Sequence, residues 1–430
     1  MVSLKLKKYI EIAELFLLCF IIFFIPLNVN STFIPIGILV LIFFMKKENY
    51  SQLRNVFLKP KFIILILPYL FTLLGLLYTQ NVREGNVQLG IASSLVAFPL
   101  IFLSFKSNSQ KHKTEFIQMS MVGGILLAYI ICMTNAVFNY FGTKDINVFV
   151  YQNLASALNK GPHHLSYSVL FGIIVIIGNL LGRTPLFIGK KNYLYIKIIL
   201  FFLFSTFLFQ LLSKISIILF ITSMFIIFIY MIINKRLKKK TAIALLAVVV
   251  ALIIGFAQIP AVQQRFENLI TAFTSSDEQN IYKEESTALR LAAIRASKSI
   301  IKENFWLGVG TGDLFDNLQD YYKDNGYTYA YENRISPHNQ FLRSFIMYGI
   351  LGFISVLLIF ILLGYTAIKK KHFIMLFWTF IMLFIFCVED MLGIKNGIIF
   401  FCYYTSYFIL CPDDTNYIIK SLNNINSIYK

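Results

Sequence analysis

Arg290 and His338 are the residues of this sequence whose types and settings best suit chemistry. In a helical projection of 287–304, Arg290 falls on the apolar face that also holds Leu289 and Ala293. A guanidinium on such a face needs a partner, because an unpaired buried charge is costly. Its planar fork fits phosphate or carboxylate oxygens. The alternatives are a structural ion pair with a carboxylate of the same loop, 259–339, and a side chain that extends to water.

His338 and three further residues carry basic side chains beside apolar runs. His338 directly precedes such a run, and a histidine can act as a general base near neutral pH. The alternative is an interfacial histidine that bonds only to backbone, and it applies equally to His163 and His164 at the start of another run. Lys214 stands in a short turn between two runs, where an isolated cation suggests a function. Its alternative is contact with lipid headgroups.

The region around 310 offers neither a nucleotide site nor a metal site. Its glycine-rich turn has no Gly-Lys-Ser/Thr after it and no strand before it, so both phosphate-binding fingerprints are missing. We predict a tight turn between two helices. The glycines of this turn are Gly308, Gly310 and Gly312. Three carboxylates follow at a spacing more typical of a solvated helix face than of a metal site: Asp313, Asp316 and Asp320.

The composition indicates an all-α integral membrane protein. Of 430 residues, 57% are hydrophobic and 14% are charged, whereas soluble domains are usually about a quarter charged. The apolar residues form runs close to the length of about 20 residues that crosses a bilayer core. We predict about twelve transmembrane helices, at roughly 9–28, 32–45, 61–78, 89–105, 116–138, 165–181, 194–212, 215–233, 241–258, 340–366, 373–388 and 393–410.

The distribution of positive charge predicts the orientation. The net charge of +18 lies in short clusters between apolar runs, such as 235–240, which argues against a nucleic-acid partner. With the N-terminus in the cytoplasm, most clusters fall inside, as the positive-inside rule requires. Helices one to nine then occupy 1–258, a large extracytoplasmic loop occupies 259–339, the last three helices occupy 340–410, and 411–430 is a cytoplasmic tail.

The loop 259–339 is predicted to hold two amphipathic helices. The first covers 287–304, with Ser286 and Thr287 as N-caps. The second follows the glycine-rich turn and ends at Gly326. None of the five cysteines lies in the loop, so we predict no disulfide framework and no zinc site. We expect the helix pair to lie on the outer membrane surface.

The stretch 290–352 resembles the O-antigen ligase and O-antigen polymerase family. The matching elements occur in the family's order: Arg290, the run 304–312, the pair His338-Asn339 and the glycine-rich opening 348–352. The sequence departs from the family at Ile294, where members often have Trp, and at Ser213-Lys214, where they often have Ser-Arg. A lysine keeps the charge but loses the bidentate fork. Glu389 also resembles a family position.

The resemblance implies a GT-C-like glycosyltransferase that works without a metal or other cofactor. It would move a glycan from undecaprenyl diphosphate to a sugar hydroxyl of a glycolipid or glycan, with inversion, at the outer face of the bacterial inner membrane. Arg290 and Lys214 would stabilise the diphosphate, and His338 would be the base. The other residues that we assign to the substrate-binding site are His164, Asn339 and Glu389.

Three alternatives stay open. A repeat-unit polymerase of the same family would use the same donor and differ only in its acceptor. A flippase or other transporter should show internal repeats or charges at the membrane midplane, and the sequence has few of either. A receptor or scaffold would bind proteins through the loop 259–339 and would not need Arg290 and His338 close together.

Overall fold

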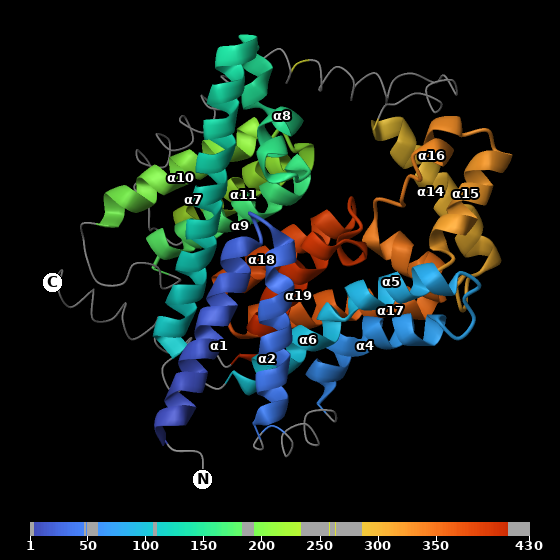
Figure 1. The fold of residues 1–430 in the computed structure, drawn as a ribbon, viewed down its shortest axis with the longest axis horizontal. Coiled ribbons are helices and arrows are strands. Elements are labelled where there is room, and N and C mark those ends of the chain that lie inside the picture. The colour runs from blue at the N-terminus through green and yellow to red at the C-terminus, as the bar shows by residue number, and fades with distance from the viewer. Residues whose placement is uncertain are drawn as a thin grey trace.

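The computed structural model of the protein describes residues 4–46, 59–105, 110–182, 193–233 and 286–411, with a few isolated positions. Within these ranges it consists of helices and connections, without strands (Figure 1). The α-helices are α1 (Leu4–Phe24), α2 (Phe33–Met45), α4 (Pro60–Gly75), α5 (Val82–Ala92), α6 (Ser94–Ser104), α7 (Gln110–Thr143), α8 (Tyr151–Ala155), α9 (Pro162–Leu180), α10 (Tyr193–Gln210), α11 (Lys214–Ile233), α14 (Ser286–Glu303), α15 (Leu314–Asp324), α16 (Thr328–Glu332), α17 (Gln340–Lys369), α18 (Phe373–Phe386) and α19 (Lys395–Leu410). The short 3-10 helices are η1 (Val29–Thr32), η2 (Ile146–Phe149), η3 (Ser156–Leu158) and η5 (Met391–Gly393).

The protein is a helical integral membrane protein. Six helical segments of the described part are long and apolar enough to cross a membrane: Val82–Ser104, Lys113–Thr143, Pro162–Leu180, Tyr193–Gln210, Lys214–Ile233 and Gln340–Lys369. Shorter apolar helices cover Val29–Met45, Pro60–Gly75 and Phe373–Phe386. Every predicted apolar run within the described ranges overlaps with helix, although several helices end two to four residues before the predicted run does. The predicted run 241–258 lies outside the described residues.

The fourth predicted run, 89–105, begins earlier in the structure than the sequence suggests. Helix starts at Val82, because the side chain of Asn81 accepts the backbone N–H of Glu84 at 3.1 Å and caps a polar first turn. Hydropathy does not detect such a turn. The segment is divided into α5 and α6 at Ser93, whose hydroxyl donates to the carbonyl of Gly90.

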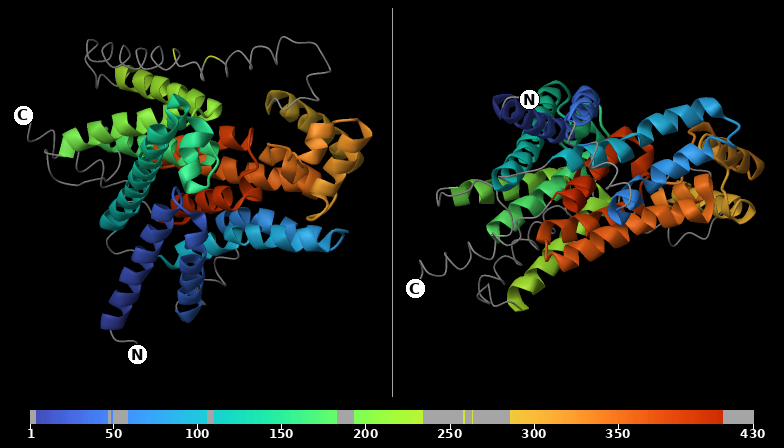
Figure 2. Two further views of the ribbon diagram at one scale, coloured as in Figure 1. Left: turned by 45° about the horizontal axis from the view of Figure 1, so that its top comes forward. Right: turned by 90° about the horizontal axis from the view of Figure 1, so that it is seen from below.

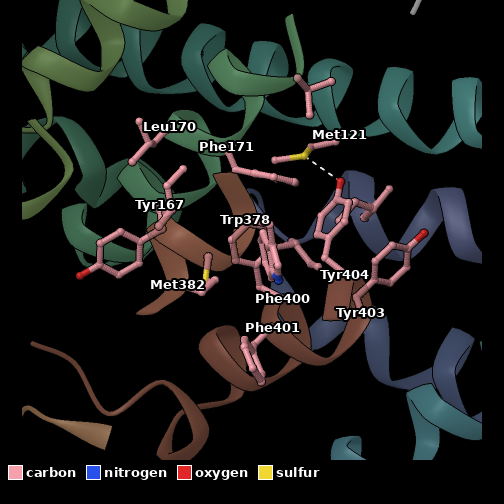
Figure 3. Close-up of a cluster of buried hydrophobic side chains, with 14 of the residues drawn as sticks. Met121, Tyr167, Leu170, Phe171, Trp378, Met382, Phe400, Phe401, Tyr403 and Tyr404 are labelled. Atoms are coloured by element: carbon pink, nitrogen blue, oxygen red, sulfur yellow. Dashed lines mark hydrogen bonds between the residues drawn. The ribbon is translucent and has the colours of Figure 1, made fainter. Parts of the chain in front are cut away.

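An aromatic core joins α9, α18 and α19 (Figure 3). Trp378 of α18 is fully buried. Its ring lies 4.7 Å from Phe171 of α9, and 5.0 Å and 5.1 Å from Phe400 and Tyr404 of α19, between centroids. Tilted and edge-to-face aromatic pairs of this kind each contribute about 0.5–1.5 kcal/mol beyond the area they bury. The core therefore fixes the two helices whose connection carries Glu389.

A smaller lobe consists of α14, α15 and α16 packed on the first half of α17 (Figure 2). Its buried cluster includes Leu289, Ala292, Ala296 and Ile300 of α14, Leu318 and Tyr322 of α15, and Ile346 and Met347 of α17. The two amphipathic helices predicted in this region are present, and α16 is an addition that the sequence pattern does not reveal. The lobe holds α14, and with it Arg290, against the start of α17.

The glycine-rich segment 305–312 passes beside a kink in α17. The kink is at Gly349, whose φ of +65° is left-handed. Three hydrogen bonds join the two segments: Val309 N–H to the Ile346 carbonyl (2.8 Å), Gly310 N–H to the Met347 carbonyl (3.0 Å) and Ile350 N–H to the Phe305 carbonyl (2.9 Å). The predicted tight turn between two helices is therefore present, and its amides serve the fold.

The predicted solvated carboxylate face is wrong at Asp313. This side chain is buried and accepts the backbone N–H groups of Gln80 and Asn81 at 2.7 to 3.1 Å. Asp316 accepts the side-chain amide of Asn81 at 2.8 Å, whereas Asp320 is exposed. Two of the three carboxylates thus anchor α15 to the turn before α5, which helical spacing alone does not show. Among the described residues no cluster of potential metal ligands occurs.

Gly349→Ala should destabilise the protein. A Cβ at this position would lie 2.1 Å from the Trp306 carbonyl oxygen, and left-handed backbone strain alone costs about 1–3 kcal/mol. Gly364, in the same helix, has open space around it, so Gly364→Ala should be neutral or stabilising by about 0.5–1 kcal/mol. Thermal unfolding in detergent compares the two variants, and equal melting temperatures would contradict this account of the kink.

Candidate active site

Glu389 is the centre of the candidate site. It lies in the connection 387–394 between α18 and α19, and its side chain is 10% exposed. Its Oε1 is 3.6 Å from Nη2 of Arg290, and its Oε2 is 3.7 Å from Nδ1 of His338. Both distances exceed hydrogen-bond length, so these are contacts between charged or polar groups. One carboxylate thus joins α14 to the residue two positions before α17.

Arg290 stands in the second turn of α14, next to buried Leu289. Its side chain is 41% exposed. The sequence predicts that this guanidinium needs a partner, and the partner in the structure is Glu389. The sequence leaves open a structural ion pair with a carboxylate of the loop 259–339, whereas the carboxylate in the structure comes from the connection between α18 and α19. The contact also brings the guanidinium to the same carboxylate that His338 contacts.

His338 is held in an uncommon backbone conformation. Its φ is +46°, a left-handed value that costs a non-glycine residue about 1–2 kcal/mol. Such residues concentrate at functional sites, where the surrounding structure enforces them. Here the enforcement comes from Asn339, the N-cap of α17, whose side-chain oxygen accepts the backbone N–H of Leu342 at 3.0 Å.

Asn339 also ties His338 to the connection that carries Glu389. Its backbone N–H donates to Oδ1 of Asp390 at 2.8 Å, and its side-chain amide donates to the carbonyl of Cys387 at 2.9 Å. Together with the cap, these bonds engage both polar atoms of the side chain. The observed contacts of Asn339 position His338, and they leave its predicted part in substrate binding as a prediction.

A buried ion pair between Arg343 and Asp390 also stabilises the connection 387–394. Nη1 of Arg343, in the first turn of α17, is 3.7 Å from Oδ2 of Asp390, and both side chains are less than one-tenth exposed. Nη2 of Arg343 donates to Gln88 of α5 at 2.9 Å. A Cβ at Gly393 would lie 2.7 Å from the guanidinium carbon, so a larger residue there would require the Arg343 side chain to move. Arg343 thereby links α5, α17 and η5.

The electrostatic surroundings keep Glu389 ionised. Burial alone would raise the pKa of its carboxyl, but His338 at close range, with His163 and His164 of α9, outweighs burial, so the pKa lies below its ordinary value. A lowered pKa means that the folded state holds the carboxylate more tightly than the unfolded chain does. This contribution to stability is present above the ordinary pKa and is lost as the pH falls through the lowered one.

Helix α9 closes the buried side of the site. Tyr167 is fully buried and lies in the electrostatic field of Glu389 and Arg290. The ring of His164 lies 6.1 Å from that of Tyr167, and its Nδ1 is buried without a hydrogen-bond partner among the described residues. A small cavity lies between these side chains and Lys160.

Lys214 is the first residue of α11. The preceding residue, Ser213, places its hydroxyl 3.4 Å from Nδ1 of His163 at the start of α9. Its hydroxyl is also 3.0 Å from that of Ser216. The start of α11 therefore lies beside the start of α9, which carries His163 and His164.

Residues 199–357 match the family model described as O-antigen ligase. This segment is an O-antigen ligase family domain. Members of the family carry out glycan transfer of the ligase or polymerase type in membranes, and 199–357 is the part of this chain that matches the family. Comparison with curated proteins gave no match.

The O-antigen ligase domain contains Lys214, Arg290 and His338, whereas Glu389 lies beyond its matched end. The structure joins Arg290, His338 and Glu389 by direct contacts. It brings His164 close enough to Glu389 for their charges to interact. Two charged or polar residues of the matched segment, Arg290 and His338, therefore contact a carboxylate that lies outside it, in the connection between α18 and α19.

Sequence reasoning misses three residues of this region: Tyr167, Arg343 and Asp390. An arginine inside an apolar run and an acidic pair between two such runs are available signals, because ionisable groups at membrane depth are usually functional or paired. Tyr167 gives no such signal, since the chain has 24 tyrosines.

The pair of Arg343 and Asp390 should be strongly coupled. Arg343→Met and Asp390→Asn should each destabilise the protein by about 3–5 kcal/mol, because each leaves a buried charge unpaired. The double variant should lose clearly less than the sum. Arg83→Met, at an exposed position, is the control and should stay within about 0.5 kcal/mol of the wild type. Additive losses in thermal unfolding would show that the two charges do not depend on each other.

Proposed function

We propose that the protein transfers a glycan from a polyprenyl diphosphate to a sugar hydroxyl of an acceptor, in the manner of an O-antigen ligase. The observation that carries this proposal is the carboxylate of Glu389, which contacts both the guanidinium of Arg290 and the imidazole of His338. Glu389 therefore contacts both a cation suited to a phosphorylated leaving group, Arg290, and a base suited to a hydroxyl, His338. The family match to 199–357 agrees with this chemistry.

The proposed reaction is a single inverting displacement. The acceptor oxygen attacks the anomeric carbon, the bond from that carbon to the diphosphate breaks, and its electron pair leaves with the diphosphate. The hydroxyl proton moves to Nε2 of His338. Because Nδ1 faces Glu389, the carboxylate favours the tautomer with the proton on Nδ1 and stabilises the imidazolium that forms. Arg290 and Lys214 supply positive charge for the leaving group.

Arg290 is suited to this role even though it has a carboxylate partner. A guanidinium carries five N–H donors, and the ionic contact of Arg290 with Glu389 involves one oxygen, at 3.6 Å. With 41% of the side chain exposed, part of the fork remains accessible to a ligand. We propose that this part binds the diphosphate of the donor.

We further propose that the twelve-helix, GT-C-like arrangement places 259–339 and the site outside the bacterial inner membrane, with both termini in the cytoplasm. Cysteine labelling tests this placement in a cysteine-free background. Asn325→Cys, beside the turn after α15, should react with an impermeant reagent in intact spheroplasts. Lys369→Cys, at the far end of α17, should react only after lysis. The reverse pattern would overturn the orientation.

Deletion of the gene tests the function itself and separates its two forms. Loss of a ligase should leave full-length glycan on the lipid diphosphate, and loss of a polymerase should leave single repeat units there. Gel analysis and mass spectrometry of the lipid-linked and surface glycans distinguish these results. An unchanged glycan profile would contradict the proposed function, whereas loss of the lipid-linked glycan from the outer face would indicate a flippase.

His338→Ala should abolish transfer while donor binding persists. Removal of a general base typically costs about a hundred- to ten-thousand-fold in rate, and Glu389→Gln should also be damaging because it removes the charge that orients the base. His372→Asn is the control, since His372 caps α18 at the other end of α17 and Asn is also a good cap. Near-normal turnover by His338→Ala in a purified assay would leave His338 as an interfacial histidine.

Donor use should depend on Arg290 far more than on neighbouring cations of the same helix. Arg290→Ala should lose about a hundred- to thousand-fold in kcat/KM, and Arg290→Lys should recover only part, because a lysine lacks the fork. Lys298→Ala and Lys302→Ala, at exposed positions of α14, should be nearly silent.

The contribution of Lys214 to donor use can be tested in the same assay. Lys214→Ala should be damaging, and Lys214→Arg should be tolerated or improved because the family often has arginine there. Equal losses for Arg290→Ala and Lys298→Ala would remove Arg290 from the site.

A further inference from the structure

An apolar groove of about 800 Å³ lies between α2, α4, the α5–α6 pair and the start of α19. These helices are neighbours around α6 (Figure 1). Its walls carry mainly aliphatic and aromatic side chains, with two serines where α5 meets α6. Leu41 and Val87 on its rim are 63% and 52% exposed, so the groove opens to the outside of the molecule.

The lining elements indicate that the occupant is a hydrocarbon chain from the bilayer. The α5–α6 pair is one of the segments long and apolar enough to cross a membrane, and α2 and α4 are shorter apolar helices. A hollow between such helices faces lipid, where backbone groups are already satisfied within the helices and only apolar contacts remain to be made. A water-soluble ligand would find few polar partners there.

One charged residue lines the groove, and it is close in sequence to the candidate site. Lys395 is the first residue of α19, and it follows the connection that carries Glu389. Its ammonium lies 5.5 Å from the ring centroid of Phe33 in α2. The η5 turn of the same connection packs against α5, which forms a wall of the groove. The groove and the candidate site therefore share one structural support.

The hollow depends on two glycines in opposite walls. Gly37 of α2 and Gly90 of α5 both line it, and a Cβ added at either would meet no atom within 4 Å. Helix interiors usually avoid glycine, which costs roughly 0.5–1 kcal/mol relative to alanine. Both positions keep open a space that the protein itself does not fill, and a Cβ atom can be introduced at either without a clash.

We propose that this groove binds the isoprenoid chain of the lipid diphosphate donor, with Lys395 at its anionic end. This proposal rests on the proposed function, because it concerns the donor of that reaction. The apolar lining and the single cation of the groove are complementary to a long, uncharged chain that ends in an anionic headgroup. A bulk phospholipid has the same general chemistry and is the competing occupant.

Filling the groove should impair long-chain donors selectively. Gly37→Trp and Gly90→Trp are compared with Gly364→Trp, a position in α17 that also has open space. Two donors carry the same glycan diphosphate, one on a full-length polyprenol and one on a two-isoprene chain. We expect about a tenfold or greater rise in KM for the long-chain donor, equivalent to loss of burial of about two methylene groups. With the short-chain donor, all three variants should match the wild type.

Two results would overturn the groove assignment while leaving the function intact. Unchanged KM for the long-chain donor would mean that bulk lipid fills the groove, and equal losses with both donors would mean a general disturbance of the fold. Absence of transfer by the wild type would instead contradict the proposed function. In that case a photoreactive polyprenyl diphosphate still tests binding. Labelling of α2 or α6 should be lost in Gly90→Trp and blocked by unlabelled polyprenyl diphosphate, and blocking by phosphatidylglycerol would favour bulk lipid.

Discussion

A carboxylate buried in a membrane protein needs cationic or hydrogen-bonding partners, and the arrangement around Glu389 follows from that constraint. Its partners come from three places: Arg290 from α14, His338 from the residue pair before α17, and the histidines of α9 through their charge. The lobe of α14 to α16 thus meets the helical bundle at a charge contact as well as at an apolar one. Removing the carboxylate would leave Arg290 and His338 without their shared support.

The two acidic residues of the connection, Glu389 and Asp390, have different roles. Asp390 is bonded to the backbone of Asn339 and paired with Arg343, so it fixes the distance between the start of α17 and the connection. Glu389, the residue before it, is left to face Arg290 and His338. Because adjacent side chains outside regular helix point in different directions, one acidic pair can serve both the fold and the chemistry.

The sequence predicts the helices well because their signal is local. Apolar length gives the described membrane helices, and the periodicity of 287–304 gives α14 with its buried face. The sequence also singles out Arg290 and His338, because each has an unusual setting in its own segment. It does not show that Asp313 is buried, because the N–H groups that it accepts belong to Gln80 and Asn81, far away in the chain. Glu389 is recognised by resemblance, but its two contacts depend on tertiary packing.

Charge balance explains why these groups belong together in the proposed reaction. Before transfer, the negative charge of Glu389 offsets one of the two cations Arg290 and Lys214, so the three residues leave a net positive charge for the donor's diphosphate. Breaking the anomeric bond adds one negative charge to that leaving group. The same step places a proton, and one positive charge, on His338, beside Glu389. The site as a whole therefore changes little in net charge as the reaction proceeds, which matters most where the surrounding dielectric is low.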